Sequence, residues 1–188
     1  MTRTLLTLLS EQTLPTVLFI KQMGKFDRYV FLTSPKMEQQ KRGEAIRQTS
    51  DIKQYENIVV PAENLEAIAT EISKFKWNTE EEISINLTGG TKMMALAVYD
   101  FFIGSPYTIR IFYKPKDKDV IAEIYPAGKQ QIKMSAEVNL KEYLTAYGIR
   151  ILSSNSVSES PQNTELAKEL MHQIRRGEIP LTIKRAVQ

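Results

Sequence analysis

The 188-residue sequence contains no cysteine and only one histidine. Without cysteine the chain can form neither a disulfide bond nor a thiolate metal site, and a reducing, cytoplasmic location is the simplest expectation. The single histidine, His172, lies in the tail of the chain, far from the other polar motifs. We therefore expect no Ser-His-Asp triad and no bound metal.

Long apolar runs and a strong net charge are also absent. No apolar stretch approaches the length of a membrane-spanning helix, and the first residues lack the pattern of a signal peptide. We therefore expect no contact with a membrane. The formal net charge is only +3, although the isoelectric point is near 9.0. An excess this small permits a small anionic ligand but does not require a long polyanion.

Glycine is scarce too, but two of the eight glycines are adjacent in residues 83–94, ISINLTGGTKMM. The alternating apolar residues at the start of this stretch predict a strand. Gly89 and Gly90 allow a tight turn and a close approach to a ligand, and Thr91 is placed to cap the following helix. The free N–H groups of that helix, together with Lys92, favour an anion. The motif fits a phosphate-binding turn or an ordinary turn between a strand and a helix.

The rest of the pattern predicts an α/β fold. Strands are expected at residues 3–9, 28–32, 57–61 and 83–87, each followed by a helix, with an antiparallel hairpin from strands at 108–113 and 120–125. This order is typical of a doubly wound, mostly parallel, Rossmann-like sheet with a β-hairpin at its carboxyl-terminal edge. The polar helix from Pro35 to about Ser50 is expected to lie exposed. The helix Met93–Phe102 is apolar nearly all round, which fits a central position or partial use at a subunit interface.

Residues 153–188 read as a polar linker and one tail helix, after a first domain at residues 1–152. The tail is too short for a nuclease, a deaminase or a complete winged-helix domain. The chain is therefore expected to be a stand-alone domain or the sensor part of a longer protein with a carboxyl-terminal effector.

Ligands of such sheets bind at the carboxyl ends of the strands. Three polar segments are expected to meet there, and their ligand-binding candidates are Ser10, Glu11, Gln12, Thr13, Thr33, Ser34, Thr88, Gly89, Gly90, Thr91 and Lys92. Neither a P-loop nor the dinucleotide fingerprint is present, so an NTPase or a nicotinamide or flavin dehydrogenase is not expected. Hydroxyls, amides, backbone N–H groups and one lysine recognise phosphates, riboses and base edges without a metal. They can also promote attack of a ribose 2′-OH on the adjacent phosphate.

The segment Asn86–Met94 closely resembles the signature of the CRISPR-associated Rossmann fold (CARF) domain. Residues 10–15 and 36–39 resemble its first two loops, in the branch that includes CARF-nuclease and CARF-deaminase effectors. The resemblance covers roughly residues 1–152 and adds Asn86 and Gln39 to the candidate ligand-binding residues. It implies a homodimer that binds a cyclic oligoadenylate, usually the tetra- or hexa-adenylate of type III CRISPR antiviral defense, and thereby activates a fused effector. Some CARF domains also cleave the ring.

Three hypotheses follow. The first is a homodimeric sensor, with cyclic tetra-adenylate favoured as its ligand and the hexa-adenylate as an alternative. The second is a metal-independent ring nuclease that gives 2′,3′-cyclic phosphate ends, with Lys92, Thr13 and Ser10 as its catalytic residues. The third is a transcription regulator that uses the basic tail helix on DNA, although the sequence has no second helix to complete a helix-turn-helix.

Overall fold

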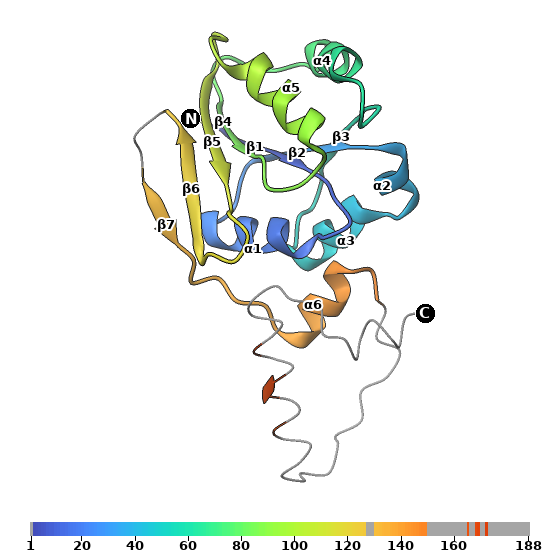
Figure 1. The fold of residues 1–188 in the computed structure, drawn as a ribbon, viewed down its shortest axis with the longest axis vertical. Coiled ribbons are helices and arrows are strands. Elements are labelled where there is room, and N and C mark those ends of the chain that lie inside the picture. Colours follow the sequence, from blue (N-terminus) through green and yellow to red (C-terminus); the bar gives the residue numbers. More distant parts are fainter. Residues whose placement is uncertain (1, 127–129, 150–164, 166–167, 170–171, 173–188) are drawn as a thin grey trace.

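One seven-stranded sheet forms the centre of the protein, with helices on both of its faces (Figure 1). The computed structural model describes residues 2–126, 130–149, 165, 168, 169 and 172. The strands are β1 (Arg3–Leu8), β2 (Arg28–Thr33), β3 (Glu56–Val59), β4 (Glu82–Asn86), β5 (Thr108–Tyr113), β6 (Val120–Tyr125) and β7 (Gln131–Lys133). The helices are α1 (Leu14–Met23), α2 (Pro35–Gln39), α3 (Arg42–Thr49), α4 (Leu65–Lys74), α5 (Lys92–Phe102) and α6 (Leu140–Ala146).

The strand order is β3-β2-β1-β4-β5-β6-β7. The pairs from β3 to β5 are parallel, whereas β6 and β7 are antiparallel and close one edge. This arrangement confirms the predicted doubly wound sheet with a hairpin edge. The central strand β1 places Leu8 beside Leu32 of β2 and Thr7 beside Asn86 of β4.

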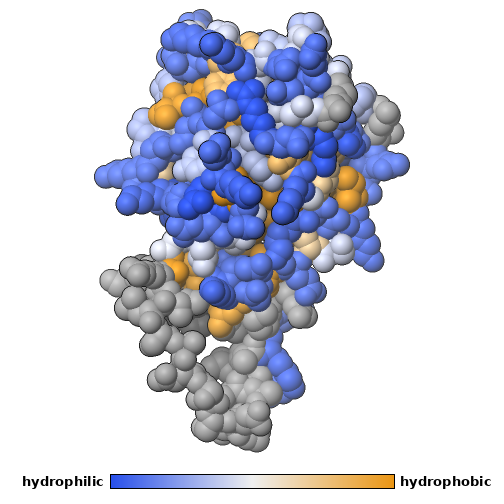
Figure 2. All heavy atoms as spheres, turned by 180° about the vertical axis from the view of Figure 1, so that it is seen from behind, coloured by the Kyte–Doolittle hydropathy of each residue, from blue (hydrophilic) through white to orange (hydrophobic). Residues whose placement is uncertain are grey.

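Two apolar layers hold the helices against the sheet. On one face, α4 and α5 bury Ile68, Ile72 and Phe102 against β4 and its neighbours. On the other face lie α1, α3 and α6, where Phe19 and Tyr143 are completely buried. The central strands, such as β1 and β4, are therefore covered on both sides, which explains the nearly continuous apolar run in β1. Away from these layers, the face in Figure 2 is mainly hydrophilic, with apolar side chains in small separate groups.

The predicted single helix from Pro35 to about Ser50 is wrong. The chain forms α2 and α3 instead, because Lys41 between them has a left-handed backbone with a φ of 53°. The prediction that this region lies exposed is also wrong in part. Ile46 is completely buried, and the missing side chain of Gly43 leaves room for the Phe31 ring, which lies 3.2 Å from where a Cβ would stand.

Helix α5 is partly buried, which confirms its central position, and use at a subunit interface stays a prediction. Met94, Val98 and Phe102 are buried in the core. Met93, Leu96 and Tyr99 lie on another side of the same helix and are 39%, 56% and 40% exposed. One side of α5 thus belongs to the core, and the other leaves large apolar side chains at the surface.

Part of the carboxyl-terminal prediction falls outside the described residues. The proposed last strand at 149–152, the linker, most of the tail helix and the domain boundary at residue 152 lie mainly in residues 150–188, of which only four are described. Within the described part, Ile149 is not in a strand, and no helix is long and apolar enough to cross a membrane.

The hairpin contains an ion pair with one buried partner, Glu123, and one partly exposed partner, Arg110, which makes a stability prediction possible. The Glu123 side chain is 4% exposed and accepts hydrogen bonds from Arg110 at 2.7 and 3.2 Å. Arg110→Met would leave this carboxylate without its partner and should cost about 2 kcal/mol of unfolding free energy, measured by urea denaturation, because Arg110 itself is partly exposed. The double variant Arg110→Met/Glu123→Leu should recover most of that loss. A double variant as unstable as the single one would contradict this account.

Candidate functional site

The candidate site lies where the sheet changes direction. The chain runs from β1 outward through β2 to β3, then returns to form β4 on the other side of β1. The segments that follow β1 and β4 therefore leave neighbouring strands at the same edge. In open α/β sheets this switch point is where ligands bind.

A buried amide fixes the loop after β4. Asn86 is completely buried and donates to the Thr7 hydroxyl at 3.1 Å. Its side-chain oxygen accepts from the backbone N–H of Thr88 at 3.1 Å and from the Thr88 hydroxyl at 2.6 Å. The Thr88 hydroxyl in turn accepts from the backbone N–H of Lys114 at 3.0 Å. Asn86 and Thr88 thus hold β1, β4 and the end of β5 together.

The two glycines pack against the end of β1. A Cβ on Gly89 would lie 2.1 Å from the carbonyl oxygen of Leu8. Gly90 has a φ of +72°, and its Cβ would stand 2.9 Å from that of Leu8. Glycine is therefore required at both positions, by space at the first and by space and backbone conformation at the second. Among the described residues, the backbone N–H groups of residues 89–91 find no acceptor.

The loop ends at the start of α5. Thr91 accepts from the backbone N–H of Met94 at 3.2 Å, as a helix cap, and donates to the carbonyl of Ala62 at 2.6 Å. Lys92 is exposed and forms no hydrogen bond or ion pair within the described part of the chain. Free N–H groups, the positive end of the α5 dipole and a lysine thus meet at one place, which suits an anion.

The segment after β1 lies against this loop. The Ser10 hydroxyl is 3.6 Å from where a Cβ on Gly89 would be, and it donates to the carbonyl of Gln12 at 3.0 Å. The Gln12 side chain is exposed. Thr13 differs from the expected rim position, because it is 1% exposed and its hydroxyl donates to the carbonyl of Ala146 in α6. Its buried side chain ties the segment to α6.

The segment after β2 is joined to the one after β1 by an exposed ion pair. Glu11 lies 2.6 Å from Lys36 of α2, and the hydrogen bond from Lys36 lowers the pKa of the Glu11 carboxyl below its ordinary value. Thr33 is completely buried, and Ser34 caps α2 by accepting from the backbone N–H of residue 37 at 3.4 Å. Gln39 is exposed at the end of α2.

The structure therefore divides the predicted residues into two groups. Ser10, Glu11, Gln12, Gln39, Gly89, Gly90 and Lys92 are at least partly exposed around the carboxyl ends of the strands. Thr13, Thr33, Ser34, Asn86, Thr88 and Thr91 use their side chains within the protein or are buried. Ligand binding by the first group stays a prediction. The second group shapes the loops that carry it.

Sequence reasoning missed two further cations near this edge. Lys114 directly follows β5, and its backbone is bonded to Thr88. Arg42 begins α3 and contributes, after Lys36, to the lowered pKa of Glu11. Lys114 could have been found by treating β5 as a parallel strand with its own carboxyl end. Arg42 could not, because the predicted single helix concealed the break before it.

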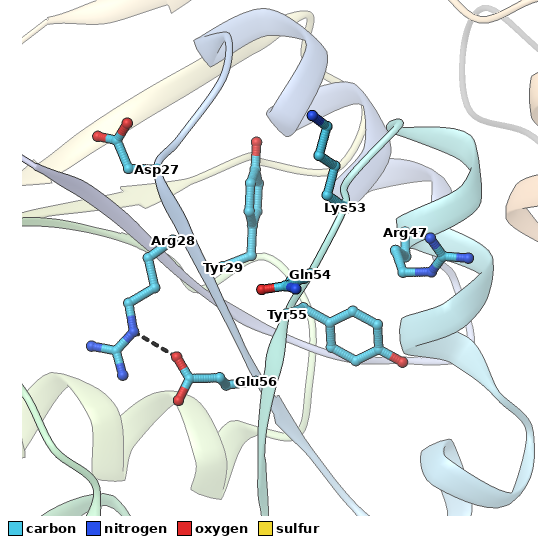
Figure 3. A pocket seen from close by; sticks show the side chains of 8 residues that line it. All are labelled: Asp27, Arg28, Tyr29, Arg47, Lys53, Gln54, Tyr55 and Glu56. Atoms are coloured by element: carbon cyan, nitrogen blue, oxygen red, sulfur yellow. Dashed lines mark hydrogen bonds and ion pairs between the residues drawn. The ribbon is translucent and has the colours of Figure 1, made fainter.

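A cavity lined by described residues lies elsewhere. It measures about 470 Å³ and is lined by Asp27, Arg28, Tyr29, Arg47, Lys53, Gln54, Tyr55 and Glu56 (Figure 3). These residues surround the amino ends of β2 and β3, opposite the glycine loop. Arg28 and Glu56 pair with each other across it at 2.6 Å. No group of acidic or histidine side chains suited to a metal occurs in the described ranges.

The fold and the glycine loop define an α/β domain of the Rossmann-like type with its candidate site at the switch point. Residues 4–143 match the family described as the Card1 CARF domain, and the chain belongs to this family. No curated protein matches the sequence.

Several solved structures share the fold. Can2 from Sulfobacillus thermosulfidooxidans, in complex with cyclic tetra-adenylate, has a TM-score of 0.65 and 24% identity over 77% of this chain and 40% of its own. Protein VC1899 from Vibrio cholerae has a TM-score of 0.64 and 16% identity over 78% of this chain and 39% of its own. A type III CRISPR defence DNA nuclease activated by cyclic oligoadenylate has a TM-score of 0.59 and 19% identity, over 98% of this chain and 32% of its own. The chain thus spans less than half of each relative.

The contact between Gly89 and Leu8 leads to a prediction. The φ of Gly89 is not left-handed, so an alanine there meets no conformational penalty, and without a clash it would tend to stabilise the protein. The 2.1 Å approach to a carbonyl oxygen should reverse this sign, and Gly89→Ala should destabilise the protein by about 3 kcal/mol in chemical denaturation.

Gly104→Ala is the control for this prediction. The φ of Gly104 is +76°, but nothing lies within 4 Å of the added Cβ. The loss of stability in this variant therefore measures backbone strain without a steric clash. A Gly89→Ala protein at least as stable as the wild type would contradict the close packing of the loop on β1.

Proposed function

We propose that this chain is a sensor domain of type III CRISPR antiviral signalling that binds a cyclic oligoadenylate. The observation that carries the proposal is the glycine loop of this CARF family member, where free N–H groups and Lys92 meet at the start of α5. Phosphates are the groups such a loop suits best. Cyclic tetra-adenylate is the favoured ring and the hexa-adenylate the alternative, because Can2, which shares the fold, is a complex with the tetra-adenylate.

A homodimer is part of the proposal. A ring with an even number of identical nucleotides has a two-fold axis, and two copies of one chain related by such an axis present the same loop twice. Each ring would then meet two copies of Lys92 and two helix amino termini. One loop per chain supplies only half of these donors.

The exposed side of α5 is the surface we assign to the second copy. Met93, Leu96 and Tyr99 lie on the helix that begins with Lys92, so a contact there brings the two glycine loops close together. Leu65 on the neighbouring α4 is a further exposed apolar side chain, at 39%. Burying these side chains supplies the hydrophobic energy that a stable dimer needs.

Regulation of an effector completes the proposed sensor. The chain spans 40% of Can2 and 32% of the DNA nuclease, so the relatives carry further chain beyond the shared fold. The nuclease is described as activated by cyclic oligoadenylate. We propose that this domain likewise acts on a fused or partner effector when it binds its ring.

Lys92→Ala should weaken binding of cyclic tetra-adenylate at least tenfold, measured by isothermal titration calorimetry. A hydrogen bond to a charged group contributes roughly 1.5–3 kcal/mol, and each ring would meet two copies of the lysine. The dimer should persist in sedimentation, because the Lys92 side chain makes no contact that holds the described structure together.

Lys53→Ala is the matched control for this variant. It removes the same charge from an exposed lysine at the opposite end of the sheet and should leave the affinity unchanged. Equal affinities for the wild type and Lys92→Ala would refute the role of Lys92. An equal loss of affinity in Lys92→Ala and Lys53→Ala would show that net charge, and not the position of Lys92, determines binding.

Ring cleavage is a second candidate function. The Ser10 hydroxyl beside Gly89 and Lys92, which has no partner among the described residues, favour it, since both can stabilise charge on a phosphate that a ribose 2′-OH attacks. In this reaction the 2′-oxygen forms a bond to phosphorus, the 5′-oxygen leaves with a proton, and a 2′,3′-cyclic phosphate remains. Thr13 fits a catalytic role less well, because its buried hydroxyl is engaged with Ala146.

Incubation of the protein with cyclic tetra-adenylate in excess EDTA tests this second function. A ring nuclease of this kind should yield linear products with 2′,3′-cyclic phosphate ends, detected by mass spectrometry, and Ser10→Ala should slow their formation. If the protein binds the ring but the ring stays intact, the protein is not a ring nuclease of this kind, and the sensor function is unaffected.

A further inference from the structure

Tyr113 is an exposed aromatic residue at the edge of the sheet that carries the glycine loop. It is the last residue of β5 and is 42% exposed, whereas its neighbour Phe112 is completely buried. Side chains alternate along a strand, so Tyr113 lies on the same face as Ile109 and Ile111. Those two isoleucines pack in the layer of α4 and α5. Tyr113 therefore stands on the α5 side of the sheet, at its carboxyl edge.

Two hydrogen bonds fix Tyr113 beside the glycine loop. The backbone N–H of Leu87 donates to the carbonyl of Phe112 at 2.9 Å. The backbone N–H of Lys114 donates to the Thr88 hydroxyl at 3.0 Å. The residues on either side of Tyr113 are thus tied to the two residues that precede Gly89. Its ring is positioned by the same contacts that position the phosphate-binding turn.

The ring is also free of the contacts that usually occupy a tyrosine. Among the described residues it has no aromatic partner within stacking distance, no cation over its face and no hydrogen bond from its hydroxyl. Lys114 follows it, and Lys116 is exposed in the turn beyond. An open aromatic face followed in the chain by two lysines suits a nucleotide, because the base can stack while the cations neutralise phosphate.

We propose that Tyr113 stacks on a base of the bound cyclic oligoadenylate and so contributes to the affinity of this site for it. In this arrangement the glycine loop and Lys92 hold a phosphate, and an attached adenine lies on the Tyr113 ring. The inference rests on the proposed function, since it assigns a residue to the same ligand. Both ends of β5 are exposed, and the exposed residue is polar at Thr108 but aromatic at Tyr113. The proposed stacking gives this exposed aromatic ring a role.

Three substitutions separate stacking from other roles of Tyr113. Tyr113→Phe keeps the aromatic face and should bind cyclic tetra-adenylate within about threefold of the wild type. Tyr113→Leu keeps apolar bulk but removes the face, and Tyr113→Ala removes both. Stacking is worth on the order of 1–3 kcal/mol per base, so the Leu and Ala variants should each bind roughly tenfold or more weakly.

Sedimentation of the same variants addresses the other use of an exposed tyrosine, a contact within the dimer. If the Leu and Ala variants stay dimeric and lose affinity, Tyr113 stacks on the ligand. If affinity falls only where the dimer dissociates, Tyr113 is a dimer contact and the inference is wrong.

Fluorescence quenching detects stacking directly, because a residue that only packs within the protein would not be quenched by the ligand. Tyr113→Trp adds an indole at the site, while the chain's own tryptophan, Trp77, serves as the background in the wild type. Stacked adenine should quench the added emission during titration with the ring. If the wild type binds the ring and the Leu and Ala variants bind it equally well, the role of Tyr113 is wrong but the proposed function is not. A wild type that binds no cyclic oligoadenylate would overturn the proposed function and this inference with it.

Discussion

The close packing of the glycine loop on the end of β1 is the contact on which the candidate site depends. Gly89 lies so near the carbonyl of Leu8 that no side chain fits, and this contact joins the two strands at the switch point of the sheet. It fixes where α5 begins and therefore where its free N–H groups and Lys92 stand. The same loop is held from the other side through Thr88 by the end of β5. A single turn thus coordinates three strands and one helix.

Much of the fold could be predicted from the sequence, because apolar patterns and turn residues act over a few neighbouring positions. Buried apolar runs and turn residues predicted the strands of the parallel sheet, and the charged turn at residues 116–119 predicted the hairpin. The break between α2 and α3 could not be found in this way, since Lys41 adopts a left-handed backbone with no glycine to mark it. The burial of Ile46 likewise depends on Phe31 and its neighbours, which are distant in sequence.

The candidate site was predictable in position and less so in detail. Polar residues after β1, β2 and β4 do meet at one edge, because parallel strands share that edge. Sequence alone does not distinguish a hydroxyl that faces solvent from one that holds a loop. Thr13 and Thr91 have the composition of ligand-binding residues, yet their hydroxyls donate to the carbonyls of Ala146 and Ala62. Tyr113 was not singled out, because its exposure depends on where β5 ends relative to the glycine loop.

The central claim is that one ring is shared by two chains across a two-fold axis. The ratio of bound ring to protein chain tests it most directly, by isothermal titration calorimetry or native mass spectrometry with cyclic tetra- and hexa-adenylate. The account predicts one ring for every two chains, with the complex always dimeric. Saturation at one ring per chain, or binding to a monomer as tight as to the dimer, would contradict it.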